Sequence, residues 1–200
     1  MKTILVLNSS VMQGDSVSNI LVEEAVAGLL EKYPEAEVIR HDLGTNPIPH
    51  LDSANVAGVR GVPKTETEIA TRALSDKLIA ELRSADTLVI GAPMYNFSIP
   101  TGLRSWFDYV LRAGETFQYT EQGPQGLLDN KQVILIESRG GLYSEGPAQA
   151  MDFQEPYLRT LFGFIGLKNI NFVHAEKIGF GPEARQAALA EAKERIATLS

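Results

Sequence analysis

The segment at residues 86–93, DTLVIGAP, decides the fold, because its apolar residues follow one another without polar alternation. A strand with one face in water alternates apolar and polar side chains, whereas a continuous apolar run is typical of a strand buried on both faces. Residues 3–8, TILVLN, and residues 132–138, QVILIES, show the same pattern. These three segments predict the central strands of a parallel sheet that helices cover on both sides.

Further strands and helices alternate along the chain on either side of these segments. A weaker, edge-like strand is expected at residues 36–43 and a last strand at residues 170–175. Helical spacing of apolar residues predicts helices at residues 20–33, 66–85, 101–114, 153–167 and 182–199. Five strands alternating with five helices predict an α/β fold, a doubly wound five-stranded parallel sheet with helices on both faces. We expect one domain over residues 1–200.

Local signals suggest where these elements begin and end. Ser18 or Asn19 is expected to cap the first helix, Gly114 to end the third, and Pro182 to begin the last. Residues 44–65 and 115–131 remain as two long excursions within the domain. Loops of this length are usually functional or mobile.

Composition excludes several classes of function. The chain has 200 residues and a net charge of −7, from 18 basic and 25 acidic residues. This acidic balance argues against binding to a nucleic acid or to an anionic membrane surface. With no cysteine, disulfides, thiol catalysis and zinc–thiolate sites are excluded. The apolar run at residues 3–7 is too short for a signal peptide, so we expect a cytoplasmic protein.

Three segments at the carboxyl ends of the predicted strands are candidates for a binding site, since ligands of such sheets bind there. The first, NSSVMQGDSVSN, carries Ser9, Ser16 and Ser18 and opens onto a helix. Hydroxyl groups and the N–H groups of a helix N-terminus can hold a phosphate without Lys or Arg. An ordinary Ser/Asn-rich loop with a helix cap explains this segment equally well.

The other two segments indicate a flat ligand. Residues 94–97, MYNF, place large apolar and aromatic groups in a loop, and Gly140 and Gly141 allow a backbone to approach a ligand closely. Together with the first segment, they predict a site for a phosphate attached to a flat aromatic body, as in flavin mononucleotide (FMN). The motif GFGPEA at residues 179–184 is not read as a nucleotide fingerprint, because no strand follows it.

These motifs resemble those of the FMN-dependent NADH-azoreductases and quinone reductases. The likeness rests on PMYNF at residues 93–97, SRGG at residues 138–141, the NSS opening and LFGFIG at residues 161–166, and it extends over essentially the whole chain. The resemblance implies a flavodoxin-like fold and a homodimer with one FMN per subunit near the dimer interface. It also implies NADH or NADPH as the electron donor, and quinones and aromatic azo compounds as acceptors.

The resemblance assigns roles to particular residues of this sequence. The FMN phosphate would be held by Ser9, Ser16, Val17 and Ser18. The ring would be flanked by Pro93, Met94, Tyr95, Asn96 and Phe97, and its pyrimidine side covered by Ser138, Arg139, Gly140 and Gly141. The walls of the substrate pocket would be Arg60, Phe117, Tyr119 and Phe162. Asp15 departs from the expected pattern, because a carboxylate repels a phosphate, and we expect it to point to solvent.

The hypothesis that follows is a two-electron, ping-pong transfer of hydride from NAD(P)H through the flavin to the acceptor. No protein side chain is expected to act as a general acid or base. No metal site is expected, since His41, His50 and His174 show no metal-like spacing. Alternatives are a flavodoxin-like one-electron carrier and, more remotely, a cofactor-free ester or phosphodiester hydrolase. The sequence has no GxSxG motif, which argues against the hydrolase. It also has no acidic cluster of the kind that a receiver-type signalling domain needs.

Overall fold

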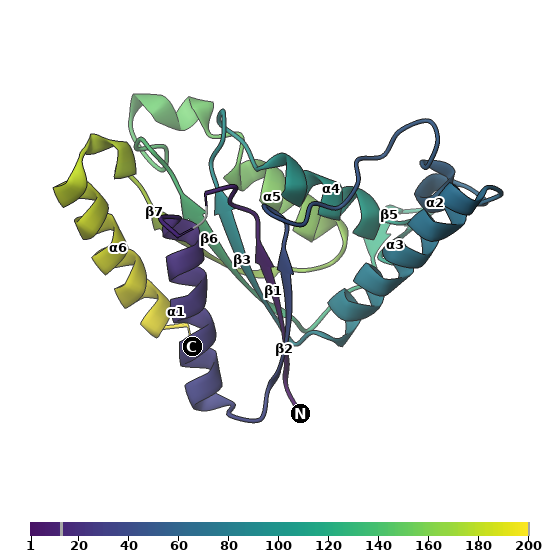
Figure 1. The fold of residues 1–200 in the computed structure, drawn as a ribbon, viewed down its shortest axis with the longest axis horizontal. Helices are drawn as coiled ribbons and strands as arrows, with labels where there is room; N and C mark the ends of the chain where they lie inside the picture. Colours follow the sequence, from purple (N-terminus) through teal and green to yellow (C-terminus); the bar gives the residue numbers. More distant parts are fainter. Residues whose placement is uncertain (13, 200) are drawn as a thin grey trace.

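A five-stranded sheet with all strands parallel forms the centre of the computed structural model, which describes residues 1–12 and 14–199 (Figure 1). The strand order is β2-β1-β3-β6-β7. Its strands are β1 Thr3–Asn8, β2 Glu37–Asp42, β3 Thr87–Pro93, β6 Gln132–Ser138 and β7 Asn169–Ala175. The chain leaves β1 toward β2 and returns to the other side of β1 for β3, so the strand order reverses at β1.

Helices cover both faces of this sheet, as the sequence predicts. They are α1 Val17–Lys32, α2 Ala57–Arg60, α3 Glu66–Ser84, α4 Thr101–Val110, α5 Glu155–Phe164 and α6 Pro182–Ala197. Two short 3-10 helices, η1 Pro147–Met151 and η2 Ile178–Phe180, lie in the connections on either side of α5 and β7. Figure 1 shows α1 and α6 on one side of the sheet and α3, α4 and α5 on the other.

The alternation of side chains along β1 explains why both faces need helices. Ile4 and Val6 are buried in the core that includes α1 and α6, whereas Leu5 and Leu7 are buried in the core on the opposite face. Successive side chains of a strand point to opposite faces, so a continuous apolar run requires an apolar partner on each side. The fold predicted from the uninterrupted apolar strands is therefore confirmed.

Two expected helix boundaries are wrong in detail. Helix α1 is capped by Ser16, whose Oγ accepts a hydrogen bond from the N–H of Asn19 at 3.3 Å, so neither Ser18 nor Asn19 is the cap. Helix α4 ends at Val110, because Leu111 leaves the helical conformation with φ −78° and ψ 80°, although its N–H still bonds the Phe107 carbonyl at 2.9 Å. Gly114 does adopt a positive φ of 80°, in the turn beyond the helix.

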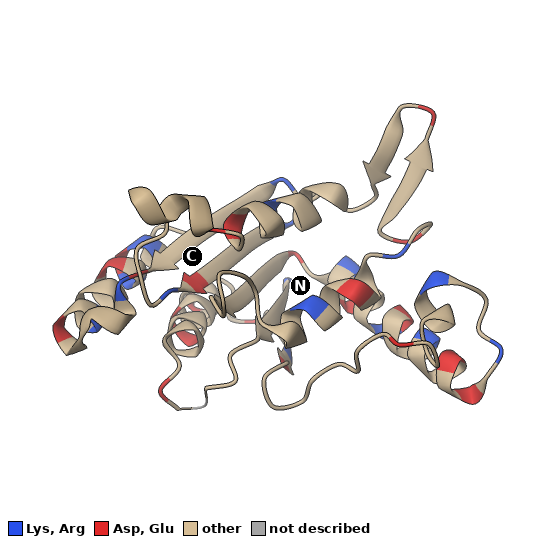
Figure 2. Cartoon of the chain, turned by 90° about the horizontal axis from the view of Figure 1, so that it is seen from above, with Lys and Arg blue, Asp and Glu red and all other residues tan. Residues whose placement is uncertain are grey.

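Both long excursions contain regular structure that the sequence pattern does not reveal. The first includes the short helix α2. The second includes an antiparallel hairpin formed by β4 Phe117–Thr120 and β5 Gly123–Gly126. Figure 2 shows this hairpin projecting from the body of the molecule, with an acidic residue near its turn. Its strands are too short and too polar to show a clear apolar alternation.

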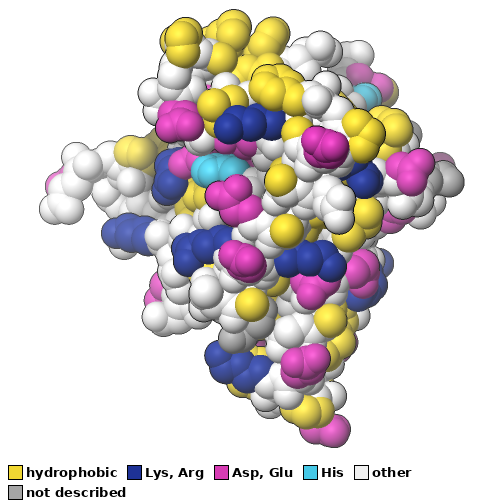
Figure 3. All heavy atoms as spheres, turned by 90° about the vertical axis from the view of Figure 1, so that its left-hand side faces the viewer, with side chains coloured by type: hydrophobic (Ala, Val, Ile, Leu, Met, Phe, Trp, Pro, Cys, Tyr) yellow, Lys and Arg dark blue, Asp and Glu magenta, His cyan; other side chains and the backbone are white. Residues whose placement is uncertain are grey.

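The surface of the face shown in Figure 3 carries basic and acidic side chains side by side, with hydrophobic side chains gathered toward its upper end. The exposed hydrophobic residues of the molecule include Met151, Phe153 and Phe180. Within residues 1–12 and 14–199, no helix combines the length and the apolar character that a membrane-spanning segment needs.

Candidate functional site

The first loop of the site (residues 9–12 and 14–16) joins β1 to α1 and carries buried serine hydroxyls. Ser9, Ser16 and Ser18 are each 5% exposed or less, and the Oγ atoms of Ser16 and Ser18 lie 3.1 Å apart. Ser9 donates its hydroxyl hydrogen to the carbonyl of Gly91 at 2.6 Å. The N–H of Ser18 has no acceptor among the described residues. Free donors at a helix N-terminus are suited to an anion.

The second loop (residues 93–99) follows β3 and has an unusual backbone. The Tyr95 and Ser98 peptide groups hydrogen-bond to each other in both directions, at 2.9 and 3.2 Å, and close a tight turn. Inside this turn Asn96 and Phe97 have positive φ angles of 48° and 71°. Such a conformation is uncommon for a side chain as large as Phe, and residues of this kind cluster at functional sites. Phe97 is 42% exposed.

The third loop (residues 138–144) follows β6 and presents backbone donors. The carbonyls of Gly140 and Gly141 accept hydrogen bonds from Gly179 and Lys177, both at 2.9 Å, so the segment after β7 supports this loop from behind. The N–H groups of Gly140 and Gly141 have no acceptor among the described residues. The loop therefore offers two adjacent free donors on its open side.

Direct hydrogen bonds hold the three loops together. The Met94 N–H donates to the Ser138 carbonyl at 2.8 Å and ties the second loop to the third. The Tyr95 hydroxyl accepts from the Val11 N–H at 3.2 Å and ties the second loop to the first. The three segments singled out in the sequence thus converge at the carboxyl ends of adjacent strands, where the strand order reverses.

A buried ionic cluster lies under the third loop, around the side chain of Arg139. The guanidinium is fully buried and pairs with Glu137 at 2.5 Å, Asp152 at 3.0 Å and Glu176 at 3.2 Å. Its Nε donates to Gln154 at 3.2 Å. The residue was expected to help cover the flavin, but only its backbone lies in the loop, because these carboxylates hold the guanidinium in the interior.

His174 extends this cluster to the next strand. Its Nε2 lies 3.1 Å from Glu137 and 2.8 Å from Glu155. Hydrogen bonds to Glu137 and then to Glu155 raise the pKa of His174 to about 9. The hydrogen bond from His174 lowers the pKa of Glu155 to about 2, whereas burial raises the pKa of Glu137. The imidazole is therefore a cation at neutral pH.

Glu176 serves the third loop in a second way. Besides Arg139, its carboxylate accepts hydrogen bonds from the Tyr143 N–H at 2.8 Å and the Ser144 N–H at 3.0 Å. Burial acts to raise the pKa of this carboxyl, but the hydrogen bonds from Ser144, Tyr143 and Arg139 outweigh burial and lower it. The cluster thus fixes both the beginning and the end of the third loop.

The hydrogen-bond donors of the three loops fit FMN, the cofactor that the sequence suggests. Buried serine hydroxyls and a helix N-terminus suit the phosphate of FMN, and the exposed side chain of Phe97 suits the face of a ring. The two free glycine donors suit a carbonyl or a negatively charged ring nitrogen. Asp15 is exposed, which confirms the expectation that its carboxylate points to solvent.

The four residues expected to line the substrate pocket do not belong to these loops. Arg60 is exposed and donates to the Leu111 carbonyl at 2.8 Å, at the end of α4 remote from the second loop. Phe117 packs on Phe164 and on Tyr119, at the base of the projecting hairpin. Tyr119 is 74% exposed.

Phe162 differs from the other three, because its side chain is fully buried in the subunit. Its ring meets that of Phe107 at a centroid distance of 5.1 Å, inside the core on the α4 and α5 face. In this subunit it is a core side chain, and its role as a pocket wall stays a prediction.

Two residues of the site are missing from the expectations drawn from the sequence. The Tyr143 ring lies edge-on to Phe97 at 6.2 Å and joins the second and third loops. Gln154 bridges Arg139 and the Ala92 carbonyl, to which its Nε2 donates at 2.7 Å. Tyr143 has a local signal in the sequence, because it is an aromatic residue two positions after the Gly140–Gly141 pair. Gln154 has no such signal, since its role depends on contacts between distant segments.

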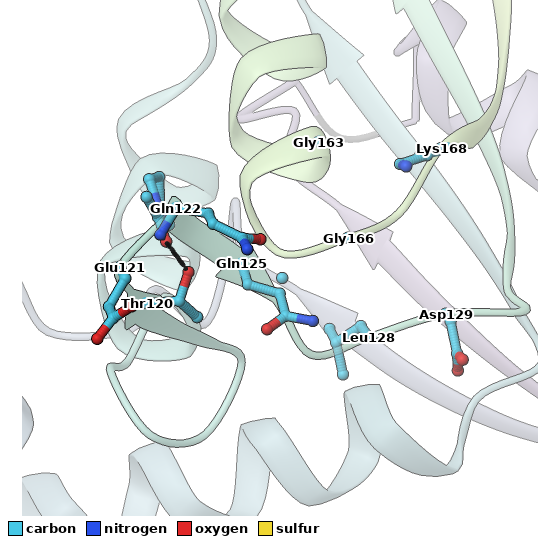
Figure 4. Close-up of a pocket in the computed structure, with 12 residues that line it drawn as sticks. Thr120, Glu121, Gln122, Gln125, Leu128, Asp129, Gly163, Gly166 and Lys168 are labelled. Atoms are coloured by element: carbon cyan, nitrogen blue, oxygen red, sulfur yellow. Dashed lines mark hydrogen bonds between the residues drawn. The ribbon is translucent and has the colours of Figure 1, made fainter.

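A separate cavity of about 830 Å³ lies beside the hairpin (Figure 4). Its lining comes from the hairpin and from the segments at residues 128–129 and 163–168, and includes Glu121, Gln125, Asp129 and Lys168. The lining carries no aromatic side chain and none of the residues of the three loops. It is therefore not the site that the sequence predicts.

Comparisons with known proteins agree with this geometry. A family profile described as flavodoxin-like fold matches residues 2–199. An FMN-dependent NADH:quinone oxidoreductase of Hyphomonas neptunium is 64% identical over 200 residues, covering 100% of this chain and 96% of that protein. One from Ralstonia nicotianae is 48% identical, covering 93% of this chain and 91% of that protein.

Solved structures are similar over the full length. An azoreductase from Bacillus anthracis str. Sterne superposes with a TM-score of 0.91 at 31% identity, covering 100% of this chain and 98% of the other. An FMN-dependent NADH-azoreductase from Bacillus anthracis str. Ames Ancestor, in complex with FMN, has a TM-score of 0.87 at 26% identity and covers 100% and 99% of the two chains. The converging loops, the family profile and these relatives show that the chain belongs to the flavodoxin-like family of FMN-dependent NADH:quinone oxidoreductases and azoreductases.

Proposed function

We propose that this protein is an FMN-dependent oxidoreductase that takes electrons from NADH and reduces quinones and aromatic azo compounds. The observation that carries this proposal is the convergence of three loops: one with serine donors, one with exposed aromatic groups, and one with free backbone donors. The names of the relatives, which specify FMN, NADH and quinone or azo reduction, support it.

The first loop would hold the phosphate of FMN. Ser9, Ser16 and Ser18 provide hydroxyls, and the backbone at Val17 and Ser18 begins helix α1. The dipole of this helix favours a negative charge at its N-terminus. Since hydroxyl and N–H donors are neutral, the site can bind a dianion although the chain as a whole is acidic.

The second and third loops would hold the ring. Met94, Tyr95, Asn96 and Phe97 would flank it, with the positive φ angles of Asn96 and Phe97 fixing the turn. When bound, the flavin supplies the chemistry: acceptance of hydride from the nicotinamide and delivery of two electrons to the acceptor. The N–H groups of Gly140 and Gly141 would donate to the pyrimidine side, where negative charge increases on reduction.

We further propose that the protein acts as a homodimer. A largely apolar hollow of about 510 Å³ lies next to the second loop, lined by residues that include Ile99, Phe153 and Tyr157. Exposed apolar surface beside a binding site is typical of an interface. Tyr119 stands on a hairpin that projects from its own subunit, so we place it in the substrate pocket of the second subunit (Figure 2). Because NADH is a cytoplasmic nucleotide, we place the protein in the cytoplasm.

Spectroscopy of the purified protein tests the proposal. We expect a yellow protein, release of FMN on denaturation, loss of the flavin absorbance on anaerobic addition of NADH, and its return on addition of a quinone. Reductive titration should take up two electrons in one step, whereas an electron carrier would take them up one at a time. A colourless protein that does not bind added FMN would overturn the proposal. Light scattering should give the mass of two chains.

A further inference from the structure

His174 lies in the buried cluster under the third loop, and the proposed reaction gives it no role. It stands directly opposite Glu137 in the pairing of β7 with β6. Its Nε2 bonds both Glu137 on β6 and Glu155 on α5. A histidine that links two carboxylates on two different elements, one of them fully buried, is placed where its charge affects the local structure.

A short chain of contacts leads from this imidazole to the third loop. The Glu137 oxygen that faces His174 also accepts from the Arg139 guanidinium at 2.5 Å. The Arg139 N–H donates to the Ala175 carbonyl at 2.8 Å, and its own carbonyl accepts from Ile178 at 3.2 Å. Gly140 and Gly141 are the next two residues in the chain after Arg139. Arg139 is therefore one of the residues that orient the two free glycine donors, and Glu137 is one of the three carboxylates that position its guanidinium.

The proton on the His174 imidazole contributes to the charge balance of the groups around it. The groups that face it or its partners are Glu137, Glu155, Arg139, Asp152, Arg159 and Glu176. An adjoining cavity of about 330 Å³ adds Glu145, Lys177 and Glu191. Four of the six facing groups are carboxylates, so the two arginines alone do not balance them. Loss of the imidazolium proton leaves this cluster more negative beneath the loop.

We infer that His174 is a positioning residue for the third loop. Its positive charge shares one Glu137 oxygen with Arg139, which limits how far the guanidinium is drawn toward Glu137. The charge thereby holds the Gly140 and Gly141 donors in the orientation that favours the more negative, reduced state of the cofactor. This inference rests on the FMN site proposed above. It adds a residue from β7, outside the three loops, that acts on the cofactor only through its neighbours.

A metal site is a second interpretation of the side chains that meet at His174. Glu137, Glu155 and His174 each offer one ligand atom, all within 4.8 Å of one another, and Glu137 Oε1 has no partner among the described residues. The Arg139 guanidinium, however, already bonds Glu137 and places a fixed positive charge beside this position. Such a charge opposes a cation, so we favour the protonated histidine and make the metal an outcome of the test.

The first experiment follows the loop in the apoprotein. In the wild type, the ¹³C carbonyl resonances of Gly140 and Gly141 should shift with pH, with the same midpoint as the His174 imidazole, near the pKa of about 9. In His174→Gln this shift should disappear. His41→Gln is the matched control, because His41 also bonds a carboxylate, Glu81 at 2.6 Å, but on another part of the fold. Resonances that do not move, or that move equally in His174→Gln, would overturn the inference.

The second experiment measures the midpoint potential of bound FMN at pH 8. His174→Gln should weaken binding of reduced FMN relative to oxidised FMN about tenfold, which lowers a two-electron potential by about 30 mV. The double variant Glu137→Gln/His174→Gln removes both charges and should return most of this shift. If His174→Gln does not fold, His174→Asn replaces it with the same expected shift. An unchanged potential in His174→Gln, or a stoichiometric metal ion that this variant loses, would overturn the inference.

The two experiments separate the inference from the proposed function. Failure of the wild type to bind FMN would contradict the proposed function, while the resonances of the apoprotein would still report whether His174 controls the loop. Normal FMN binding together with an insensitive loop would contradict the inference alone.

Discussion

The hydroxyl of Tyr95 accepts a hydrogen bond from the backbone N–H of Val11 at 3.2 Å and lies 3.3 Å from the hydroxyl of Ser10. The two residues that this hydroxyl contacts follow β1, whereas Tyr95 itself follows β3. One side chain therefore links the loop expected to hold the phosphate with the loop expected to hold the ring. The distance between these loops has to match the length of the ligand that spans them.

Replacement of Tyr95 by Phe should weaken FMN binding by about 2- to 12-fold, because it removes a hydrogen bond of about 0.5–1.5 kcal/mol while keeping the ring. Fluorescence titration of the apoprotein with FMN measures the change. Tyr33→Phe, at the end of α1 remote from the loops, should leave the affinity unchanged. An unchanged affinity in Tyr95→Phe would show that this link does not set the geometry of the site.

The fully buried Phe162 and the exposed Tyr119 should respond in opposite ways to truncation. Phe162→Ala should lower the free energy of unfolding by about 3–5 kcal/mol, because it leaves a cavity against Phe107. Tyr119→Ala should change it by less than about 0.5 kcal/mol, yet raise KM for a quinone. Urea unfolding and steady-state kinetics measure the two effects. A strongly destabilised Tyr119→Ala would show that this ring is needed for folding.

The stability of the protein should fall at alkaline pH because of His174. Its pKa in the folded protein, about 9, lies above the value of about 6.5 expected in an unfolded chain. A group whose pKa is raised on folding contributes stability that is fully present below the unfolded value and is lost as the pH rises through the folded value. The thermal midpoint should therefore decrease between pH 7 and pH 10. In His174→Gln the part of this decrease due to the imidazole should be absent.

Removal of the charge of Asp15 should strengthen FMN binding only slightly. The carboxylate is exposed, so water and salt screen its repulsion of a phosphate. We expect a gain of no more than about threefold for Asp15→Asn at low ionic strength, vanishing in high salt. Titrations at two salt concentrations check this. A large gain that persists in high salt would mean that the carboxylate turns toward the ligand.

The central strands of the sheet could be predicted from the sequence, because a strand that is buried on both faces appears as an uninterrupted run of apolar residues. Residues 3–8 and 87–93 carry uninterrupted apolar runs, and only a parallel sheet between two layers of helices satisfies such runs. The hairpin at residues 117–126 has no such apolar run in its sequence, since most of its side chains are exposed.

The three loops could also be located from the sequence, because parallel strands end at one edge of a sheet and the segments after them meet there. The sequence by itself determined that serine hydroxyls, large apolar groups and paired glycines would gather at that edge. Only the tertiary structure decided which groups face outward: it turned the Arg139 guanidinium into the interior and brought His174 and Gln154 beneath the loop. The reason is that local residue patterns fix backbone elements, whereas most partners of the buried Arg139, such as Asp152 and Glu176, come from other segments and are known only once these pack together.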